Sequence, residues 1–254
     1  MNAPRNAFKV ALSRGERQIG LWSSLCSNIA AEVVAESGFD WILLDTEHAP
    51  NNVPTLLSQL QAMTEGTATA IVRPAWNDAV LIKRILDIGA PGILVPYVQN
   101  VAEAEQAVAA TRYPPRGVRG VAGAVRAARY GRDRKYLHTA DKEICVLVQV
   151  ETRSALEQLE AIAAVDGVDG VFIGPSDLAA SFGHIGNPNH EDVQNAIRNA
   201  VERLAAVGTP AGILATAPED AERYIDWGYG FVAVGSDLIL LARGADALAR
   251  SFAS

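Results

Sequence analysis

Segments typical of buried β-strands alternate with segments typical of α-helices along the chain, and this alternation limits the possible folds more than any other feature. Most of the strand segments are short apolar runs, as expected for strands that are covered on both faces of a parallel sheet. Each is followed by a stretch with the apolar spacing of a helix, which indicates right-handed strand–helix–strand crossovers. The eight expected strands are 19–25, 40–46, 68–72, 92–98, 144–152, 171–173, 211–215 and 231–234.

Eight strand–helix units in 254 residues, without a linker or a low-complexity break, predict a single domain that spans residues 1–254. An α/β fold of the (β/α)8 TIM barrel type explains this number of units better than an open doubly wound sheet. The sequence also lacks the GxGxxG fingerprint expected of the open alternative. The last helix, expected from about residue 238 to 252, is apolar on more than one face. We therefore expect it to pack against another subunit as well as its own barrel.

Composition narrows the class of protein. Apolar residues make up 49% of the chain, which is enough for a large core, and the net charge of −7 argues against general nucleic-acid binding. Segment 112–135 carries seven arginines and a lysine against one aspartate, so a non-catalytic RNA-binding barrel is an alternative. We favour a solvated or intersubunit segment. No apolar run is long enough for a signal peptide or for the ~20 residues of a membrane span. With only two cysteines, a reduced cytoplasmic compartment is expected.

Residues suited to chemistry gather where the expected strands end, and in a TIM barrel these ends form the active-site rim. Glu151 ends the strand 144–152, and Asp177 closely follows the strand 171–173. Either residue alone could be a helix cap. Together at one rim, two carboxylates can share a divalent cation and leave its other positions to water and a substrate with oxygen donors. Because other polar residues end strands at the same rim, we favour the metal site.

Two further rim residues suit proton transfer and anion stabilisation. His48 is a candidate proton carrier, with Asp45 or Glu47 available to orient its imidazole. Arg73 offers a forked, permanently charged donor to a carboxylate or enolate oxygen, although a salt-bridge role stays open. No lysine ends a strand, so a Schiff-base mechanism lacks its amine. We interpret the other histidines as surface residues: His138, His184 and His190.

Six motifs in this order resemble one known family. They are DWILLDTEHAPNN, RPAWND, LDIGAPGILVPYVQN, YPPRGVRG, VQVET and GPSDLAASFG. From about residue 22 to 252 the chain resembles the metal-dependent 4-hydroxy-2-oxoheptanedioate aldolases, in the HpcH/HpaI group of class II pyruvate aldolases. The resemblance implies a carbon–carbon lyase that reversibly cleaves 4-hydroxy-2-oxo acids, through an enolate, to an aldehyde and pyruvate or hydroxypyruvate. A CoA-thioester lyase of the citryl or malyl type on the same barrel is the alternative.

The resemblance also implies a ligand set and a donor site. Glu151 and Asp177 would bind Mg²⁺, Mn²⁺ or Co²⁺, and pyruvate would chelate that ion through a carboxylate oxygen and its keto oxygen. Gln149 and the backbone amides around Ser176 and Asp177 would hold the same end of the substrate. Arg73 would stabilise the enolate and the aldehyde or alkoxide oxygen.

The remaining implied roles concern proton transfer, the aldehyde and assembly. His48 would transfer a proton, supported by Asp45 and by Asp87 reaching in from a neighbouring subunit. From its sequence context alone, Asp87 is an ordinary residue at the end of a helix. Trp22 and Leu214 would form a wall of the aldehyde pocket. The resemblance further implies a homo-oligomer, a hexamer built as a trimer of dimers that exchange their last helices.

Overall fold

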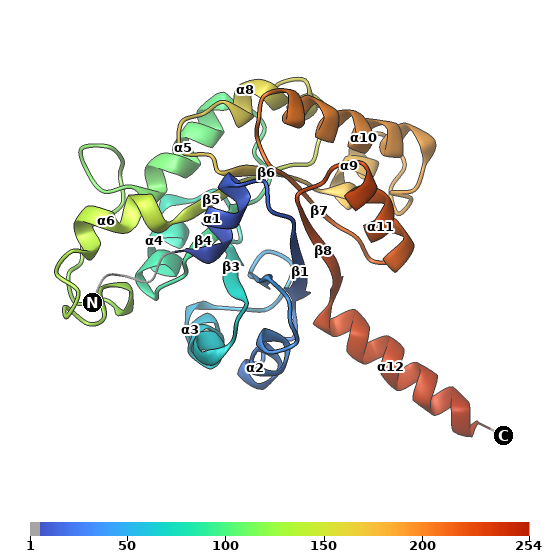
Figure 1. The fold of residues 1–254 in the computed structure, drawn as a ribbon, viewed down its shortest axis with the longest axis horizontal. Coiled ribbons are helices and arrows are strands. Elements are labelled where there is room, and N and C mark those ends of the chain that lie inside the picture. Colours follow the sequence, from blue (N-terminus) through green and yellow to red (C-terminus); the bar gives the residue numbers. More distant parts are fainter. Residues whose placement is uncertain (1–5, 254) are drawn as a thin grey trace.

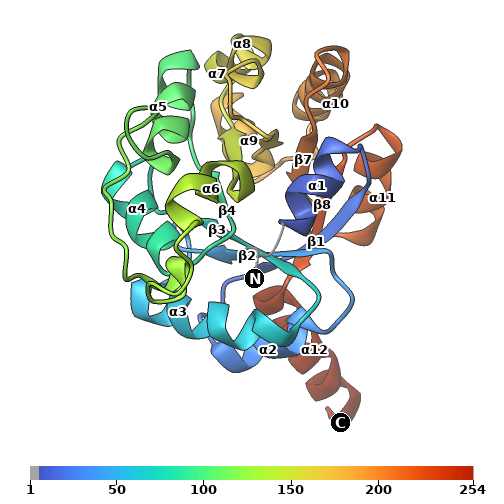
Figure 2. The same cartoon turned by 60° about the vertical axis from the view of Figure 1, so that its left-hand side comes forward.

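Eight parallel strands pair in chain order and close into a barrel with helices outside it (Figures 1 and 2). This computed structural model describes residues 6–253. The last strand pairs with the first, with Gln18 opposite Phe231 and Ile19 opposite Val232. The predicted (β/α)8 TIM barrel is therefore confirmed. The strands are β1 (Gln18–Ser23), β2 (Trp41–Asp45), β3 (Thr69–Arg73), β4 (Gly92–Val95), β5 (Cys145–Val150), β6 (Gly170–Ile173), β7 (Ala211–Leu214) and β8 (Phe231–Ser236).

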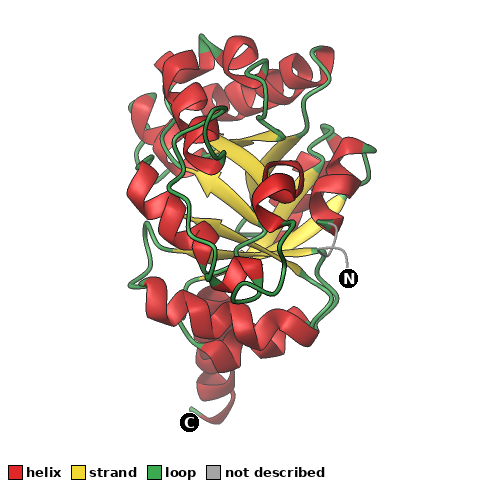
Figure 3. Ribbon diagram, turned by 90° about the vertical axis from the view of Figure 1, so that its left-hand side faces the viewer, coloured by secondary structure: helices red, strands yellow, loops and turns green. Residues whose placement is uncertain are grey.

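The helices surround the strands, as the enclosed yellow arrows in Figure 3 show. They are α1 (Ala7–Ser13), α2 (Asn28–Ala35), α3 (Val53–Ala62), α4 (Ala79–Asp87), α5 (Val101–Thr111), α6 (Tyr136–Glu143), α7 (Arg153–Leu156), α8 (Leu159–Ala163), α9 (Pro175–Ser181), α10 (Glu191–Ala206), α11 (Pro218–Asp226) and α12 (Asp237–Phe252). Two short 3₁₀ turns are η1 (Met63–Glu65) and η2 (Arg126–Ala128). Within residues 6–253, no helix has the length and apolar character needed to cross a bilayer.

Some boundaries differ from those expected. The helix expected over residues 153–164 is two short helices, α7 and α8, separated at Glu157 and Gln158. Strand β4 stops at Val95 rather than at 98, because Pro96 has no N–H to continue the ladder and Tyr97 turns into a left-handed conformation. The additional α9 begins with a proline in its first turn, where the missing N–H costs no hydrogen bond.

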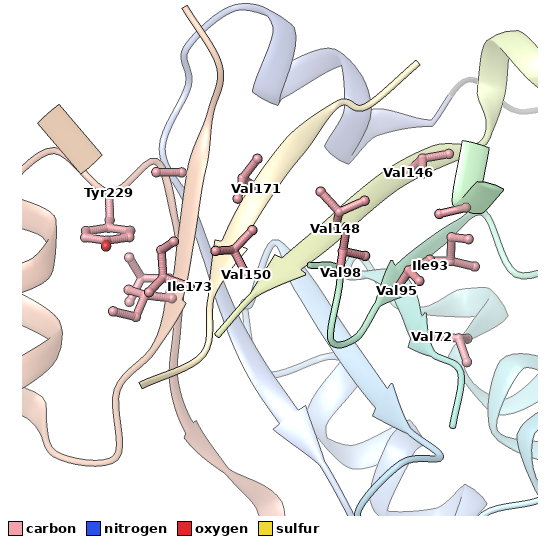
Figure 4. Packing of buried hydrophobic residues seen from close by; sticks show 14 of the residues in the cluster. Val72, Ile93, Val95, Val98, Val146, Val148, Val150, Val171, Ile173 and Tyr229 are labelled. Carbon is pink, nitrogen blue, oxygen red and sulfur yellow. The ribbon is translucent and has the colours of Figure 1, made fainter. Parts of the chain in front are cut away.

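Alternate residues of each strand point to two separate layers of core. Valines 146, 148 and 150 of β5 face outward to the helices, together with the neighbouring Val171 and Ile173 of β6 (Figure 4). Leu147, between them in sequence, belongs to the second layer inside the barrel. Both faces of such a strand are buried, which explains the continuous apolar runs in the sequence.

Aromatic rings fill the amino end of the barrel. Phe8 of α1 packs against Trp41 and Phe231 with ring centroids 5.6 and 5.9 Å apart. Glycines give these rings room: a Cβ at Gly20 would lie 2.2 Å from the Trp41 ring, and one at Gly212 would lie 2.0 Å from the Phe231 ring. Helix α1 therefore covers the amino end of the barrel with its Phe8 ring.

Helix α12 projects away from the barrel (Figures 1 and 2). Its first residue, Asp237, is buried and accepts hydrogen bonds from the Ser23 hydroxyl and the Ser24 N–H, both at 2.8 Å. These bonds attach the helix to the carboxyl end of β1. The large apolar side chains beyond that point are exposed: Leu238, Leu240, Leu241, Leu248 and Phe252. The expected exchange of this helix between subunits stays a prediction.

Candidate active site

A cavity of about 240 Å³ opens at the carboxyl ends of the strands, and most of the residues selected from the sequence line it. Four other hollows, of about 530, 760, 280 and 430 Å³, are larger, and none of them is lined by these residues. The convergence of side chains, rather than size, therefore identifies the candidate site. Eight of the expected site residues line the cavity: Trp22, Asp45, His48, Arg73, Gln149, Ser176, Asp177 and Leu214.

Glu151 follows β5 directly and is only 2% exposed. Its Oε1 accepts a hydrogen bond from the backbone N–H of Tyr97 at 2.8 Å, and its Oε2 accepts one from the side-chain amide of Gln149 at 2.6 Å. Tyr97 has a φ of 55°, a left-handed conformation that is unfavourable for a tyrosine, and in that conformation its N–H bonds Glu151. A Cβ at Gly174 would lie 2.5 Å from Oε2 of Glu151, so glycine leaves space for the carboxylate.

The charges around Glu151 fit a divalent cation. Burial and the nearby negative charge of Asp177 raise the pKa of Glu151 to about 7, although the hydrogen bond from Gln149 opposes this. A cation held between the two carboxylates removes the penalty for keeping both ionised. Gln149 Oε1 is a further buried oxygen without a hydrogen-bond partner. This set of oxygen donors suits Mg²⁺ or Mn²⁺ and leaves positions open for a substrate.

Arg73 is held rigidly between two carboxylates. Asp45 and Arg73 are register partners at the ends of β2 and β3. The guanidinium donates to both oxygens of Asp45, at 2.9 and 2.7 Å, and its third nitrogen lies 2.8 Å from Glu47 Oε2. It also stacks over the Trp22 ring at 4.8 Å. Burial alone would raise the pKa of Asp45, but the hydrogen bonds and charge of Arg73 hold that pKa below its usual value.

His48 lies at the mouth of the cavity and its side chain is 68% exposed. Glu47 is the carboxylate nearest its ring, with Oε2 3.9 Å from Nε2. Asp45 contacts the backbone N–H of His48, at 3.4 Å, and not the imidazole. Of the two carboxylates considered from the sequence, Asp45 therefore positions Arg73 and the loop, and Glu47 lies closer to the histidine.

Asp87 is not brought into the cavity of its own chain. It is the last residue of α4, and its carboxylate accepts a hydrogen bond from Arg119 at 2.8 Å. The Arg119 side chain is fully buried between the rings of Tyr113 and Tyr136, at 4.7 and 5.7 Å. Asp87 retains 20% exposure, so the carboxylate is fixed on one side and accessible on another.

The apolar part of the cavity comes from strands β1 and β7, which are separated in the barrel only by β8. Trp22 is buried near the end of β1, and its ring packs against Phe172 at 5.6 Å. Leu214, half-buried, ends β7. Both side chains line the cavity, and their role as a wall of the aldehyde pocket stays a prediction.

Comparison with known proteins places this geometry in a family. The family model described as HpcH/HpaI aldolase/citrate lyase matches residues 18–244. The chain belongs to the HpcH/HpaI family. It is similar to a pyruvate aldolase from Rhizobium etli, at 58% identity over all 254 residues and the whole of that protein. A 4-hydroxy-2-oxo-heptane-1,7-dioate aldolase from Klebsiella pneumoniae is 56% identical over 97% of this chain and 94% of that protein.

The HpcH/HpaI assignment also holds at the level of structure. A crystal structure of a family protein from Burkholderia cenocepacia matches with a TM-score of 0.95 and 39% identity, over 98% of this chain and all of the other. Within this HpcH/HpaI chain, sequence reasoning missed Tyr97 and Gly174 as supports of Glu151. The GP pair after β6 and the proline before Tyr97 were the only signals, and neither reveals a contact with a residue of another strand.

Proposed function

We propose that this chain is a divalent-metal-dependent aldolase that reversibly cleaves 4-hydroxy-2-oxo acids to an aldehyde and pyruvate or hydroxypyruvate. The observation that carries the proposal is the buried carboxylate of Glu151, which is influenced by the charge of the exposed Asp177, together with the fixed guanidinium of Arg73 in the cavity that Asp177 also lines. The full-length similarity to a pyruvate aldolase and to a 4-hydroxy-2-oxo-heptane-1,7-dioate aldolase supports it.

Glu151 and Asp177 would hold the ion, with Mg²⁺, Mn²⁺ and Co²⁺ as candidates. When bound there, the ion supplies a Lewis acid beside the keto oxygen of a 2-oxo acid, where negative charge develops. The methyl group of pyruvate is far too weakly acidic for any side chain to deprotonate unaided, so this assistance is needed.

The start of α9 and Gln149 would bind the substrate carboxylate. The first N–H groups of a helix have no carbonyl partner within it, and Ser176 and Asp177, in the first turn of α9, both line the cavity. The amide of Gln149 donates to Glu151 and stays within the same cavity. Donors fixed in this way orient the 2-oxo acid before reaction at little entropic cost.

Arg73 would stabilise the enolate oxygen and the oxygen of the aldehyde. Its position is set by Asp45 and Glu47 on one side and the Trp22 ring on the other. A charge that is already fixed needs no reorganisation as the C3–C4 bond breaks, and this is the main source of electrostatic catalysis. The two carboxylates also prevent Arg73 from collapsing onto the Glu151–Asp177 pair.

His48 would take the proton of the substrate's 4-hydroxyl during cleavage and return it during addition. Its 68% exposure in a single chain leaves space for a second subunit. We infer that Asp87 of a neighbouring chain approaches this imidazole, because its carboxylate is anchored by Arg119 yet partly open.

A homo-oligomer, which we propose to be a trimer of dimers, follows from the same reasoning. The outer face of α12 exposes five large apolar side chains, and Ile29 and Val33 on α2 are 68 and 65% exposed. A second copy of α12 covering such faces removes apolar surface from water on both chains. Leu241→Glu is expected to reduce the oligomer mass measured by light scattering. Val207→Glu, a control at an exposed valine outside α2 and α12, is expected to leave that mass unchanged. An unchanged mass in Leu241→Glu contradicts the helix exchange.

Subunit complementation tests the shared site. His48→Ala and Asp87→Asn are each expected to be nearly inactive. If the two residues act across an interface, mixed oligomers regain activity, because about a quarter of the sites then combine an intact His48 with an intact Asp87. If mixing restores no activity, then either both residues act within one chain or Asp87 has no role in catalysis, and the shared site is contradicted.

The direct test of the function uses two assays on metal-depleted protein. With Mn²⁺, Mg²⁺ or Co²⁺ restored, pyruvate methyl protons are expected to exchange with D₂O. Aldol products are expected with at least one acceptor among succinic semialdehyde, tartronic semialdehyde, lactaldehyde and glyceraldehyde. Full activity without a divalent ion, or no exchange with any of them, contradicts the proposal.

The CoA-thioester alternative receives less support. The cavity has a volume of about 240 Å³, and its lining contains one arginine, already paired, and no lysine. A nucleotide tail needs more room and more positive charge. The RNA-binding alternative is weakened too, because five of the seven arginines of segment 112–135 bind groups of this chain: Arg112, Arg116, Arg119, Arg126 and Arg132. A cytoplasmic location remains our expectation, since Cys26 and Cys145 are free thiols.

A further inference from the structure

Two histidines and an aspartate meet outside the active site, in the loop between α9 and α10. His184 lies in the loop, His190 caps the start of α10, and Asp192 belongs to its first turn. None of the three lines the active-site cavity. Sequence reasoning treated both histidines as separate surface residues. The structure instead joins them in one group, which we call the two-histidine cluster (His184, His190 and Asp192).

The ligand atoms of the cluster converge. One ring nitrogen from each histidine and a carboxylate oxygen all lie within 4.8 Å of one another. His184 Nε2 and His190 Nδ1 approach the same oxygen, Asp192 Oδ2, at 3.3 and 3.6 Å. The two rings are stacked nearly parallel, with centroids 3.4 Å apart and an angle of 12°, so one ring has to turn before both can direct an in-plane lone pair at one ion. Within residues 6–253, this is the one group of three or more histidine, cysteine or acidic residues that meets this geometry.

The hydrogen bonds of the cluster leave two acceptors facing each other. The backbone N–H of Asp192 donates to His190 Nδ1 at 3.2 Å, so this nitrogen carries a lone pair and no proton. It therefore cannot donate to Asp192 Oδ2, and a lone pair and a carboxylate stand 3.6 Å apart. Because an imidazole nitrogen has one lone pair, a cation bound at Nδ1 would replace the N–H of Asp192 there, and it would also offset the charge of the nearby carboxylate.

We propose that the two-histidine cluster is a second metal site, for a transition-metal ion such as Zn²⁺, Ni²⁺ or Cu²⁺. Two imidazoles and one carboxylate are the ligand set that these ions prefer, and Mg²⁺ prefers oxygen ligands throughout. The exposed fractions of the side chains, 26% for His184, 37% for His190 and 62% for Asp192, let an ion enter from solvent. Three protein ligands leave a fourth position for water.

Binding would link the segment after α9 to the start of α10. Helix α9 carries Ser176 and Asp177 in its first turn, and the backbone reaches His184 only a few residues after that helix ends. Because the ion binds the folded arrangement and not the unfolded chain, its concentration should raise thermal stability by mass action. The aldolase chemistry with Mg²⁺ does not require this ion.

The test measures zinc binding in a tag-free Glu151→Gln chain, in which the proposed active-site ligand pair is broken. Equilibrium dialysis at pH 7 followed by elemental analysis is expected to find one Zn²⁺ per chain. His184→Phe, which keeps a stacked ring but removes its nitrogens, and His190→Ser, which keeps an N-cap oxygen, are each expected to weaken that binding at least tenfold. His138→Ala removes an exposed histidine from α6 and is the matched control, with unchanged binding expected.

A spectroscopic measurement distinguishes the site from loose surface binding. Cu²⁺ bound to the same Glu151→Gln chain is expected to show nitrogen hyperfine structure in its electron paramagnetic resonance spectrum, and His184→Phe is expected to change it. Circular dichroism verifies that each variant is folded. The proposal is overturned if the Glu151→Gln chain binds no Zn²⁺ at 100 µM, or if both histidine variants bind as tightly as their parent. The cluster is then only a hydrogen-bonded helix cap.

Discussion

The two ends of the barrel are built from the same strands but from opposite kinds of side chain. Strand β2 begins with Trp41 in the aromatic group at the amino end and ends four residues later with Asp45 beside Arg73. Strand β8 begins with Phe231 in that same aromatic group and ends with Ser236 at the cavity. Each strand therefore contributes to stability at one end and to chemistry at the other.

The contrast is energetic as well as chemical. At the amino end, Phe8, Trp41 and Phe231 are at most 1% exposed and pack at favourable ring distances. At the carboxyl end, Glu151 is buried at a cost, as its raised pKa of about 7 shows, and Tyr97 adopts an unfavourable conformation to hold it. The favourable packing at the amino end offsets the folding free energy that the buried charges cost at the carboxyl end. Substitutions at the two ends should therefore separate activity from stability.

Glu151→Gln is expected to have the largest effect on activity and little effect on folding. The glutamine can still accept the N–H of Tyr97, and it removes a buried charge, so the melting temperature should stay the same or rise. The catalytic efficiency, kcat/KM, for aldol cleavage is expected to fall by at least about 10³-fold, because the ion loses a ligand. Steady-state kinetics and thermal unfolding on one preparation provide both values. A fall in stability without a fall in kcat/KM would reverse the roles assigned to the two ends.

Phe8→Ala is expected to show the opposite pattern. Removing a fully buried ring from the amino end leaves a cavity beneath α1, and the free energy of unfolding should decrease by about 3–5 kcal/mol. At 25 °C the folded variant should keep the kcat of the parent, since the ring is at the far end from the cavity. Urea unfolding and an activity assay below the transition check this. A comparable loss of kcat would mean that the two ends are mechanically coupled.

Arg73→Lys tests whether geometry matters at the carboxyl end in addition to charge. Lysine keeps the positive charge near Asp45 and Glu47 but cannot donate to both oxygens of Asp45. We expect Mn²⁺ binding to persist and the exchange of pyruvate methyl protons in D₂O to slow by about 10²-fold. Proton NMR of pyruvate follows the exchange. An exchange rate equal to that of the parent removes Arg73 from the enolisation step.

Glu160 on α8 lies outside both ends of the barrel and forms an exposed ion pair with Arg203, so it shows how little such a surface pair adds to stability. Hydrogen bonds from Arg203 lower the pKa of Glu160 from 4.5 to about 2. A carboxyl group with a lowered folded-state pKa stabilises the protein above its unfolded pKa, and this contribution is lost as the pH falls from about 4.5 to 2. Because the Glu160 side chain is 41% exposed, we expect less than about 1 kcal/mol. Comparing unfolding of the parent and Glu160→Gln at pH 6 and pH 3 should show the difference between them shrinking at the lower pH.

The sequence predicts the barrel well because strand-end positions follow directly from alternation. Asp45 and Arg73 end neighbouring strands in the sequence, and they are register partners in the structure. It does not predict which partner a charged side chain chooses there: Asp45 is expected beside His48, and its pairing with Arg73 is seen only in the structure. The sequence also does not predict that α1 covers the amino end or that Tyr97 supports Glu151. Both features depend on contacts between segments that are far apart in the chain. Local spacing carries no signal for such contacts.

The central claim is that Glu151 and Asp177 hold one divalent cation at the carboxyl end of the barrel. The most direct test is to titrate chelator-treated protein with Mn²⁺ and to monitor the free ion by its electron paramagnetic resonance signal. Mn²⁺ is the suitable ion because it prefers oxygen ligands over the two-histidine cluster. We predict one bound Mn²⁺ per chain in the parent and in Phe8→Ala, and at least about a hundredfold weaker binding in Glu151→Gln and in Asp177→Asn. Equal binding by the parent and both carboxylate variants would contradict the account.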